Sequence, residues 1–338
     1  MGSSPDPLYL RGSSLTSAST TTVFSLVHSD MVALEETLER AVTAEGPVMR
    51  QLLGLVLPGS GKRIRPALAM LCGRVNEYDP GKLIPFAAAL EMLHTATLVH
   101  DDVVDESPVR RGEPTLGVRA RNSVAVLVGD YMFAQAASQA AVTRHLDLFD
   151  AFARTAMAII GGQIDEAWSD GSLSLTREQY LRRIGGKTAA LFALSALGGA
   201  MLSKAPEPVA HALEQYGYKL GLAFQIVDDI LDVAGEERSL GKPVGSDIRQ
   251  GVVTLPAILV RDQVPESLFR SAYSGDGHRD EAIGLLLEMI RTRGGVEGSY
   301  AEADRLKAEA CSALEIVPAG AVRDALVELA DFVVRRAT

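Results

Sequence analysis

The sequence has few cysteines and few aromatic residues. Among 338 residues only Cys72 and Cys311 are cysteines, and aromatic side chains make up 5%. Two cysteines are too few for a disulfide framework or a cysteine-based metal site. They are typical of ordinary thiols in a reducing compartment, so we expect a cytoplasmic protein.

Positive charge is also scarce, because 33 Lys and Arg face 43 Asp and Glu, for a net charge of −10. A nucleic-acid partner would require a basic surface, so none is expected. No run of 18 uncharged apolar residues occurs, so no transmembrane segment is expected. Residues 1–22 lack the basic-then-apolar order of a signal peptide and predict a flexible N-terminal tail.

Alanine and leucine supply much of the 47% hydrophobic content, which favours helices. Apolar periodicity runs from residue 23 almost to residue 338, without a linker and without strand-like alternation. We therefore expect one all-α domain over 23–338, with a loop at 235–251. After an amphipathic hairpin broken near residues 46–47, helices are expected at about 64–76, 81–105, 116–144, 148–170, 177–203, 207–233, 252–263, 279–293, 297–314 and 319–336.

Two aspartate-rich motifs of the form DDxxD, at 101–105 and 228–232, each end an apolar helix. Asp101 and Asp105 share one helix face, as do Asp228 and Asp232, with Cβ atoms about 5–6 Å apart. Such pairs repel each other and face the negative end of the helix dipole. One motif alone could be a solvated acidic helix end, but two copies predict a Mg²⁺ site that binds phosphate.

Candidate anion-binding groups accompany the motifs. Lys62 and Arg65 follow a glycine-rich turn, and an arginine pair lies just past Asp105. Guanidinium groups bind phosphate in a bidentate manner, although each basic cluster could also be a solvated or neutralising group. His94 lies two turns before Asp101, on roughly the same face. The further candidates are Arg110, Arg111, Lys187, Thr188, Phe224, Gln225 and Lys242.

In order along the chain, the segments GKRIRP, HDDVVDESPVRRG, GGQIDE, GGKTAALF, FQIVDDILD and LGKPVGSDIRQG resemble trans-isoprenyl diphosphate synthases. The resemblance is greatest to the long-chain polyprenyl members and covers about residues 32–334. It implies a single large helical bundle around a central cavity. It also implies condensation of isopentenyl diphosphate with an allylic diphosphate, with two or three Mg²⁺ per active site.

The resemblance also implies a role for each matching residue. Metal binding would fall to Asp101, Asp102, Asp105, Asp228, Asp229 and Asp232. The allylic diphosphate would contact Arg110, Lys187 and Lys242, with Asp247 supporting the loop of Lys242. Isopentenyl diphosphate would be held by Lys62, Arg65, His94 and Arg111. The reaction centre would be lined by Gln163 and Gln225, and Thr188 and Phe224 would also bind substrate. Val252 departs from the family pattern, which often has a polar residue there.

Product length is predicted from the residues below the first motif. Ala96 and Thr97 are small where short-chain relatives commonly carry a bulky aromatic residue, so the tunnel should continue past them. Leu148 and Phe152 begin the helix that leads to Gln163, and Phe152 is a candidate tunnel floor, although it could be ordinary core. We expect products of about C30–C50.

Other functions are weighed against this one. A short-chain farnesyl or geranylgeranyl diphosphate synthase is the nearest alternative. A class I terpene cyclase would have a different second motif and no isopentenyl site. An inert partner subunit would have lost aspartates, whereas all six are present. A plain helical scaffold is the remaining alternative. The resemblance implies a homodimer.

Overall fold

The computed structural model describes residues 23, 25–43, 45–57, 62–110, 112–168, 173–235, 244–274 and 279–335. The expected tail at 1–22 lies outside these residues, as do Arg111 and Lys242. Within the described ranges the regular secondary structure is helical apart from one very short hairpin. The prediction of an all-α fold is confirmed.

The helices follow one another along the chain with short connections. Their bounds are α2 (His28–Thr43), α3 (Pro47–Val56), α4 (Ile64–Cys72), α5 (Pro80–Val104), α6 (Leu116–Ala120), α7 (Asn122–Val142), α8 (Leu146–Trp168), α9 (Arg177–Ile184), α10 (Ala190–Leu202), α11 (Glu207–Ala234), α13 (Ser246–Arg249), α14 (Leu255–Val260), α15 (Glu266–Ser274), α16 (Arg279–Thr292), α17 (Gly295–Ala313) and α18 (Ala321–Arg335). Between α9 and α10 lies a π-helical turn, η2 (Gly185–Ala189).

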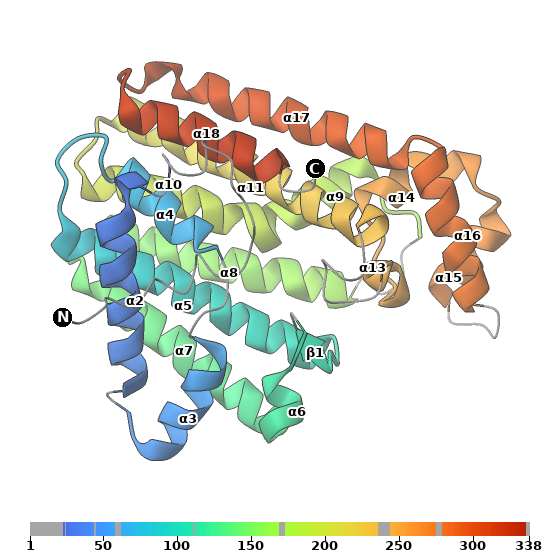
Figure 1. The fold of residues 1–338 in the computed structure, drawn as a ribbon, viewed down its shortest axis with the longest axis horizontal. Helices are drawn as coiled ribbons and strands as arrows, with labels where there is room; N and C mark the ends of the chain where they lie inside the picture. Colours follow the sequence, from blue (N-terminus) through green and yellow to red (C-terminus); the bar gives the residue numbers. More distant parts are fainter. Residues whose placement is uncertain are drawn as a thin grey trace, which may run out of the picture.

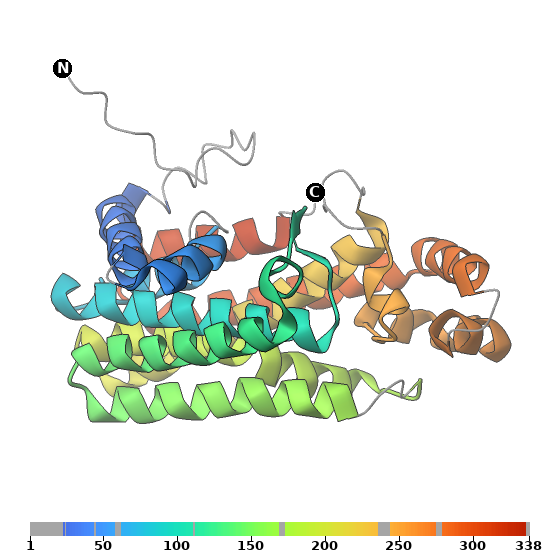
Figure 2. The ribbon, with the colours of Figure 1, turned by 90° about the horizontal axis from the view of Figure 1, so that it is seen from below.

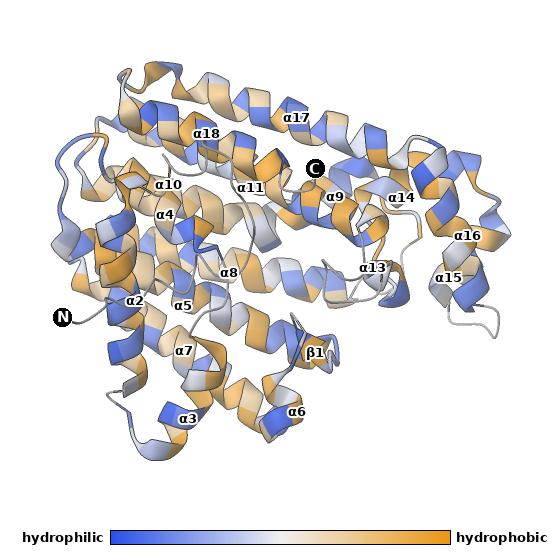
Figure 3. Ribbon diagram, in the orientation of Figure 1, coloured by the Kyte–Doolittle hydropathy of each residue, from blue (hydrophilic) through white to orange (hydrophobic). Residues whose placement is uncertain are grey.

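The long helices α5, α8, α11 and α17 run roughly along the long axis of the molecule (Figures 1 and 2). Helix α10 lies inside and packs on α4, α5, α8 and α11, while α17 covers α11 from the outside. In Figure 3 helix α17 carries both hydrophilic and hydrophobic residues along its length, as expected of an outer helix with one face on the core. The aspartate-bearing helices α5 and α11 are thus central elements, flanked by neighbours that fix their positions.

Helix α5 shows how local sequence sets an element of this core. Asp79 caps its N-terminus by accepting a hydrogen bond from the Gly81 amide, and Pro80 occupies the first turn.

Two apolar stretches, Pro80–Val104 and Arg177–Leu202, are long and apolar enough to cross a membrane. Their most apolar windows are 67% and 72% buried inside the protein, as expected for core helices.

Several expected boundaries were wrong. The helix expected at 116–144 is interrupted at Arg121, whose φ of 126° cannot continue a helix. The segment 235–251 contains the short helix α13. A hairpin of two-residue strands, β1 (Val109–Arg110) and β2 (Glu113–Pro114), was not expected, and neither was α15. These elements are too short for periodicity to reveal them.

The helix expected at 177–203 contains the π turn η2, which positions the candidate site. Here α8 and η2 approach closely because both present glycine. A Cβ on Gly162 would lie 3.2 Å from the Lys187 amide nitrogen, and one on Gly186 would lie 3.3 Å from the Ala158 carbonyl oxygen. Single π turns inside helices are frequent at functional sites. This one carries Lys187 and Thr188.

Candidate active site

The first aspartate motif occupies the last turn of α5. Burial raises the pKa of Asp101 to about 6 and also raises the pKa of Asp105. Burial raises the pKa of Asp102 as well, although the Arg110 guanidinium opposes it by donating to Asp102 at 2.7 Å. The motif is therefore an acidic cluster that has lost part of its hydration. A nearby cation would offset the free-energy cost of removing these charged carboxylates from water.

Lys187 supplies positive charge beside this cluster. Its Nζ donates to Glu166 Oε1 at 3.1 Å. Burial lowers the pKa of Lys187, but the negative charges of Glu166 and Asp101 outweigh burial, so the pKa is raised overall. The Arg183 guanidinium lies 3.9 Å from the other Glu166 oxygen. Lys187 is thus a firmly protonated cation at the first motif.

The second motif, at the end of α11, is more deeply buried. Asp229 is 4% exposed and Asp232 is 1% exposed, whereas Asp228 is only half-buried. Asp229 accepts hydrogen bonds from Tyr180 at 2.6 Å and from Gln225 at 2.9 Å. Burial and the charge of Asp247 raise the pKa of Asp229 to about 8.

Asp232 is hydrogen-bonded to the backbone of the segment at Gly245 and Asp247. Its Oδ2 accepts from the Asp247 amide at 3.1 Å, and its carbonyl oxygen accepts from the Gly245 amide at 2.8 Å. Among the three aspartates of this motif, Asp228 is therefore the one with the most access to a ligand.

A chain of contacts through η2 joins the two motifs. Lys187 interacts electrostatically with Asp101, and the adjacent Thr188 donates to Gln225 at 2.7 Å. Gln225 in turn donates to Asp229. The π turn therefore lies between the aspartates of α5 and those of α11. Two motifs 127 positions apart (228 − 101) thus belong to one site.

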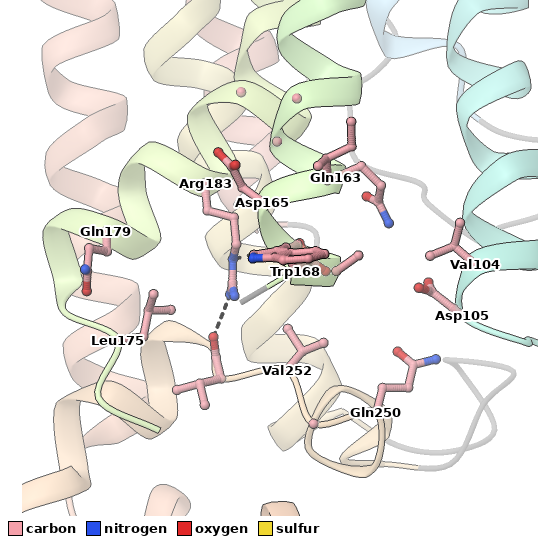
Figure 4. Close-up of a pocket in the computed structure, with 18 of the residues that line it drawn as sticks. Val104, Asp105, Gln163, Asp165, Trp168, Leu175, Gln179, Arg183, Gln250 and Val252 are labelled. Carbon is pink, nitrogen blue, oxygen red and sulfur yellow. Dashed lines mark hydrogen bonds and ion pairs between the residues drawn. The ribbon is translucent and has the colours of Figure 1, made fainter. Parts of the chain in front are cut away.

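A cavity of about 1260 Å³ opens beside the first motif. Figure 4 shows Val104 and Asp105 on one side, Arg183 and Trp168 on the other, and Gln163 pointing between them. Gln250 and Val252 close the lower edge. The Oε1 atom of Gln163 is buried and has no hydrogen-bond partner within the described ranges. An acceptor buried at a cavity in this way could receive a bond from a ligand.

The cations of the GKRIRP segment lie against aromatic rings. Lys62 Nζ is 5.0 Å from the ring centre of Phe332, and the Arg65 guanidinium is 4.7 Å from that of Phe192 and 5.8 Å from that of Phe224. Such cation–π contacts restrict the motion of long basic side chains. His94 is half-buried on α5. Arg111 and Lys242 lie outside the described residues.

Arg63, between these two cations, has a structural function that sequence reasoning missed. It is 3% exposed, donates to Glu35 at 2.9 Å and to the Leu57 carbonyl at 2.9 Å, and pairs with Glu91. Its φ of 48° is left-handed, at the residue that caps α4. The buried guanidinium stabilises this strained turn, which carries Lys62 and Arg65.

The residues chosen for the tunnel are largely interior. Ala96, Leu148 and Phe152 are buried, and Thr97 is half-buried. Phe152 stacks on Phe149 with ring centres 6.4 Å apart. Their burial fits either a tunnel wall or ordinary core packing.

Tyr180, Glu166 and Arg183 were also missed from sequence. A tyrosine, a glutamate and an arginine on amphipathic helices carry no signal of their own, because their partners come from other helices. Glu166 could have been found, since it lies three residues after Gln163 and hence on the same helix face.

The donor set fits a hard cation. Within the described ranges, no three carboxylate, imidazole or thiol groups lie close enough to hold a metal by themselves. Mg²⁺ commonly binds through one or two carboxylates together with water and substrate phosphate oxygens. Asp101, Asp105 and Asp228, with basic groups beside them, fit a Mg²⁺ that arrives with a diphosphate.

Comparison with known proteins agrees with this geometry. A family model described as polyprenyl synthetase matches residues 47–290. Heptaprenyl diphosphate synthase component 2 of Geobacillus stearothermophilus is 37% identical over 317 residues, covering 93% of this chain and 98% of that protein. A short chain isoprenyl diphosphate synthase of Methanothermobacter thermautotrophicus is also 37% identical, over 291 residues, covering 83% of this chain and 88% of that protein.

The fold has solved counterparts. The crystal structure of polyprenyl synthase from Caulobacter crescentus, complexed with calcium and isoprenyl diphosphate, superposes with a TM-score of 0.89 at 31% identity. The match covers 94% of this chain and 98% of that chain. The prediction of a bundle of the isoprenoid synthase type is confirmed.

The raised pKa of Asp101 predicts a pH-dependent stability. The folded state retains a proton on Asp101 up to about pH 6, which the unfolded chain loses near pH 4. Ionisation of Asp101 therefore destabilises the metal-free fold increasingly between pH 4 and pH 6 and fully above pH 6, whereas below pH 4 the group is protonated in both states and has no effect. Asp101→Asn should raise the metal-free melting temperature by roughly 2 °C or more at pH 8 and leave it unchanged at pH 4. Thermal unfolding at both pH values measures the effect, with Glu288→Gln, at an exposed position of α16, as the control variant. An equal shift of the melting temperature at pH 4 and pH 8 would contradict the prediction.

Proposed function

Since the chain belongs to the polyprenyl synthetase family, we propose that it condenses isopentenyl diphosphate with an allylic diphosphate to make a long-chain, all-trans polyprenyl diphosphate of about C30–C50. The chain is a prenyltransferase. The observation that carries the proposal is the π turn, which brings Lys187 and Thr188 between two helix ends that each present aspartates.

The allylic diphosphate is assigned to the space between the motifs. Asp101, Asp105 and Asp228 would hold Mg²⁺, because none of them is fully buried, and Asp102, which is paired with Arg110, would fix that arginine beside them. Bound Mg²⁺ supplies Lewis-acid charge to the leaving diphosphate. Lys187 is already charged and would exchange its bond with Glu166 for phosphate oxygens. Lys242 is assigned to the same diphosphate from its motif.

Isopentenyl diphosphate is assigned to the basic residues around α4. Lys62 and Arg65 flank Arg63 at the start of α4, and His94 lies on the neighbouring helix α5. Arg111 joins them by its motif. The aromatic faces beside Lys62 and Arg65 hold these two basic side chains in place, and both are of a type that binds phosphate.

The reaction breaks the allylic C–O bond, forms a C–C bond from the isopentenyl double bond and releases one proton. Gln163, Thr188, Phe224 and Gln225 would line this centre and exclude water from the allylic cation. Among these four residues none is an ordinary base, so the departing diphosphate is the proposed proton acceptor. The residues therefore bind, orient and shield the reacting groups.

The long product is supported by the residues below the first motif. Ala96 lies five residues before Asp101, about 7–8 Å along α5, and is too small to block a chain. Phe152 lies eleven residues before Gln163, about 16 Å along α8, and is the proposed floor. The heptaprenyl relative, which matches nearly the whole chain, favours the same class of product.

A homodimer is proposed from an exposed apolar surface on α7 and α8, which pack against each other. Leu127 is 66% exposed, Ile164 is 60% exposed and Trp168 is 91% exposed. The dimer surface as defined here consists of Val126, Leu127, Met157, Ile160, Ile164 and Trp168. Monomers rarely expose so many large apolar groups, and a two-fold axis would pair the surface with itself.

We also propose that residues 23–338 form one domain and that the protein acts in the cytoplasm. The interlocked packing of α4, α5, α10, α11 and α17 supports a single domain, and the two unpaired thiols of Cys72 and Cys311 are compatible with a reducing compartment. One cooperative unfolding transition of the full chain and recovery in the soluble cell fraction would test the two statements.

The metal assignment predicts a severe loss of activity. Asp101→Ala and Asp228→Ala should each lower turnover by about a thousandfold or more, because charge stabilisation by a bound metal is worth several kcal/mol. The assay uses Mg²⁺, labelled isopentenyl diphosphate and a farnesyl or geranylgeranyl starter. Glu288→Ala on α16 should stay at the wild-type rate, and near-normal turnover of both aspartate variants would reject the metal assignment.

The tunnel predicts a change in product length without loss of condensation. Ala96→Tyr should shorten the main product, since its ring would fill the path below the first motif, and Phe152→Ala should lengthen it. Ala96→Ser keeps a small side chain and serves as the control. Chromatography of extracted products measures the lengths. A wild-type product of C20 or shorter would favour the short-chain alternative.

The dimer surface predicts the oligomeric state. Wild-type protein should sediment as a dimer, and Leu127→Asp with Ile164→Asp should shift it to monomer, because buried unpaired charges are costly. Leu285→Asp, on the half-exposed face of α16, is the matched control. A wild-type monomer that gains activity only with a second, different protein would instead indicate a two-component enzyme.

A further inference from the structure

Tyr180 of α9 is a buried phenol that the proposed reaction does not use. The side chain is fully buried, and its hydroxyl donates to Asp229 Oδ2 at 2.6 Å. A buried hydroxyl needs an acceptor, but a backbone carbonyl would serve. Here the acceptor is the middle carboxyl group of the second aspartate motif, so the hydrogen bond fixes the orientation of that side chain.

The second oxygen of Asp229 is also held. Gln225 Nε2 donates to Asp229 Oδ1 at 2.9 Å, and Thr188 Oγ1 donates to Gln225 Oε1 at 2.7 Å. Tyr180 and Thr188 belong to one continuous segment, α9 followed by η2, whereas Gln225 and Asp229 lie one turn apart on α11. The four side chains therefore link this segment to α11 at two points, and we call them the Tyr180 cluster.

The Tyr180 cluster fixes how α11 faces the cavity. Tyr180 packs in a buried apolar cluster with Ile184, Leu222 and Ile226, so its hydroxyl has little freedom to move. Adjacent residues of an α-helix point about 100° apart. With Asp229 held toward α9, Asp228 is turned toward the less buried side, and Lys187, next to Thr188, is held beside the first motif.

We propose that Tyr180 is the positioning residue of the second aspartate motif. Its phenol locks α11 to the π turn, so that Asp228 and Lys187 address the same metal–diphosphate complex. Tyr180 itself touches neither metal nor substrate. This inference rests on the proposed function of the two motifs.

A buried tyrosine could also serve only the stability of the core, and the chain offers a matched control for that case. Tyr216 of α11 is likewise fully buried, and its hydroxyl donates to the Leu326 carbonyl at 2.6 Å. Tyr180→Phe and Tyr216→Phe each remove one hydroxyl and one buried hydrogen bond but keep the aromatic ring of the side chain. Both should lower the melting temperature by a similar amount, but only the first disturbs Asp229.

The experiment measures Mg²⁺ binding by calorimetry on the full chain in the presence of inorganic diphosphate. Tyr180→Phe should weaken binding roughly tenfold, because Asp229 would no longer be held toward α9. Tyr216→Phe should stay within about twofold of wild type. In steady-state assays, Tyr180→Phe should lower kcat and raise the Mg²⁺ requirement, while KM for isopentenyl diphosphate, bound around α4, remains unchanged.

The outcomes separate the inference from the function on which it rests. Tyr180→Phe that binds Mg²⁺ and diphosphate like wild type would overturn the positioning role. Equal weakening in both variants would overturn it too, because the effect would then be general loss of stability. Wild-type protein that binds no Mg²⁺ with diphosphate and makes no product would instead reject the proposed function itself.

Discussion

The organisation of the site depends on bringing acidic helix ends together inside a protein. Carboxylates repel one another, and burial adds to that cost, as the raised pKa values of Asp101 and Asp229 show. Lys187 lies beside the first motif, and the hydrogen bonds of Thr188 and Gln225 reach the second. Part of the cost is offset by these groups, and the remainder makes a diphosphate with its cations a favourable ligand.

Close helix packing makes that arrangement possible. The π turn can lie against α8 because Gly162 and Gly186 leave no side chain between the backbones. The same turn contacts α11, where a Cβ on Gly221 would lie 2.6 Å from the Cα of Ala189. Small residues at these crossings let α8, η2 and α11 converge, so Gln163, Lys187 and Gln225 reach one region from three elements.

The fold and the two motifs could be predicted because their signals are local. Apolar periodicity identifies long helices, and paired aspartates at a spacing of four have a meaning on any helix. The break at Arg121, the short hairpin after Asp105 and the helix α15 could not be predicted, because each spans too few residues for a period to show. Tyr180 could not be identified because its partner, Asp229, is 49 positions away.

The sequence by itself determined the helical class, the pair of aspartate motifs, the order of basic segments and hence the family, since all are carried by residue type and spacing. Only the tertiary structure decided which aspartates stay accessible. Asp228 and Asp229 are neighbours of the same type, yet Asp229 is hydrogen-bonded to Tyr180 and Gln225 while Asp228 is more accessible. That difference depends on which helix packs on which face of α11, and no local pattern encodes it.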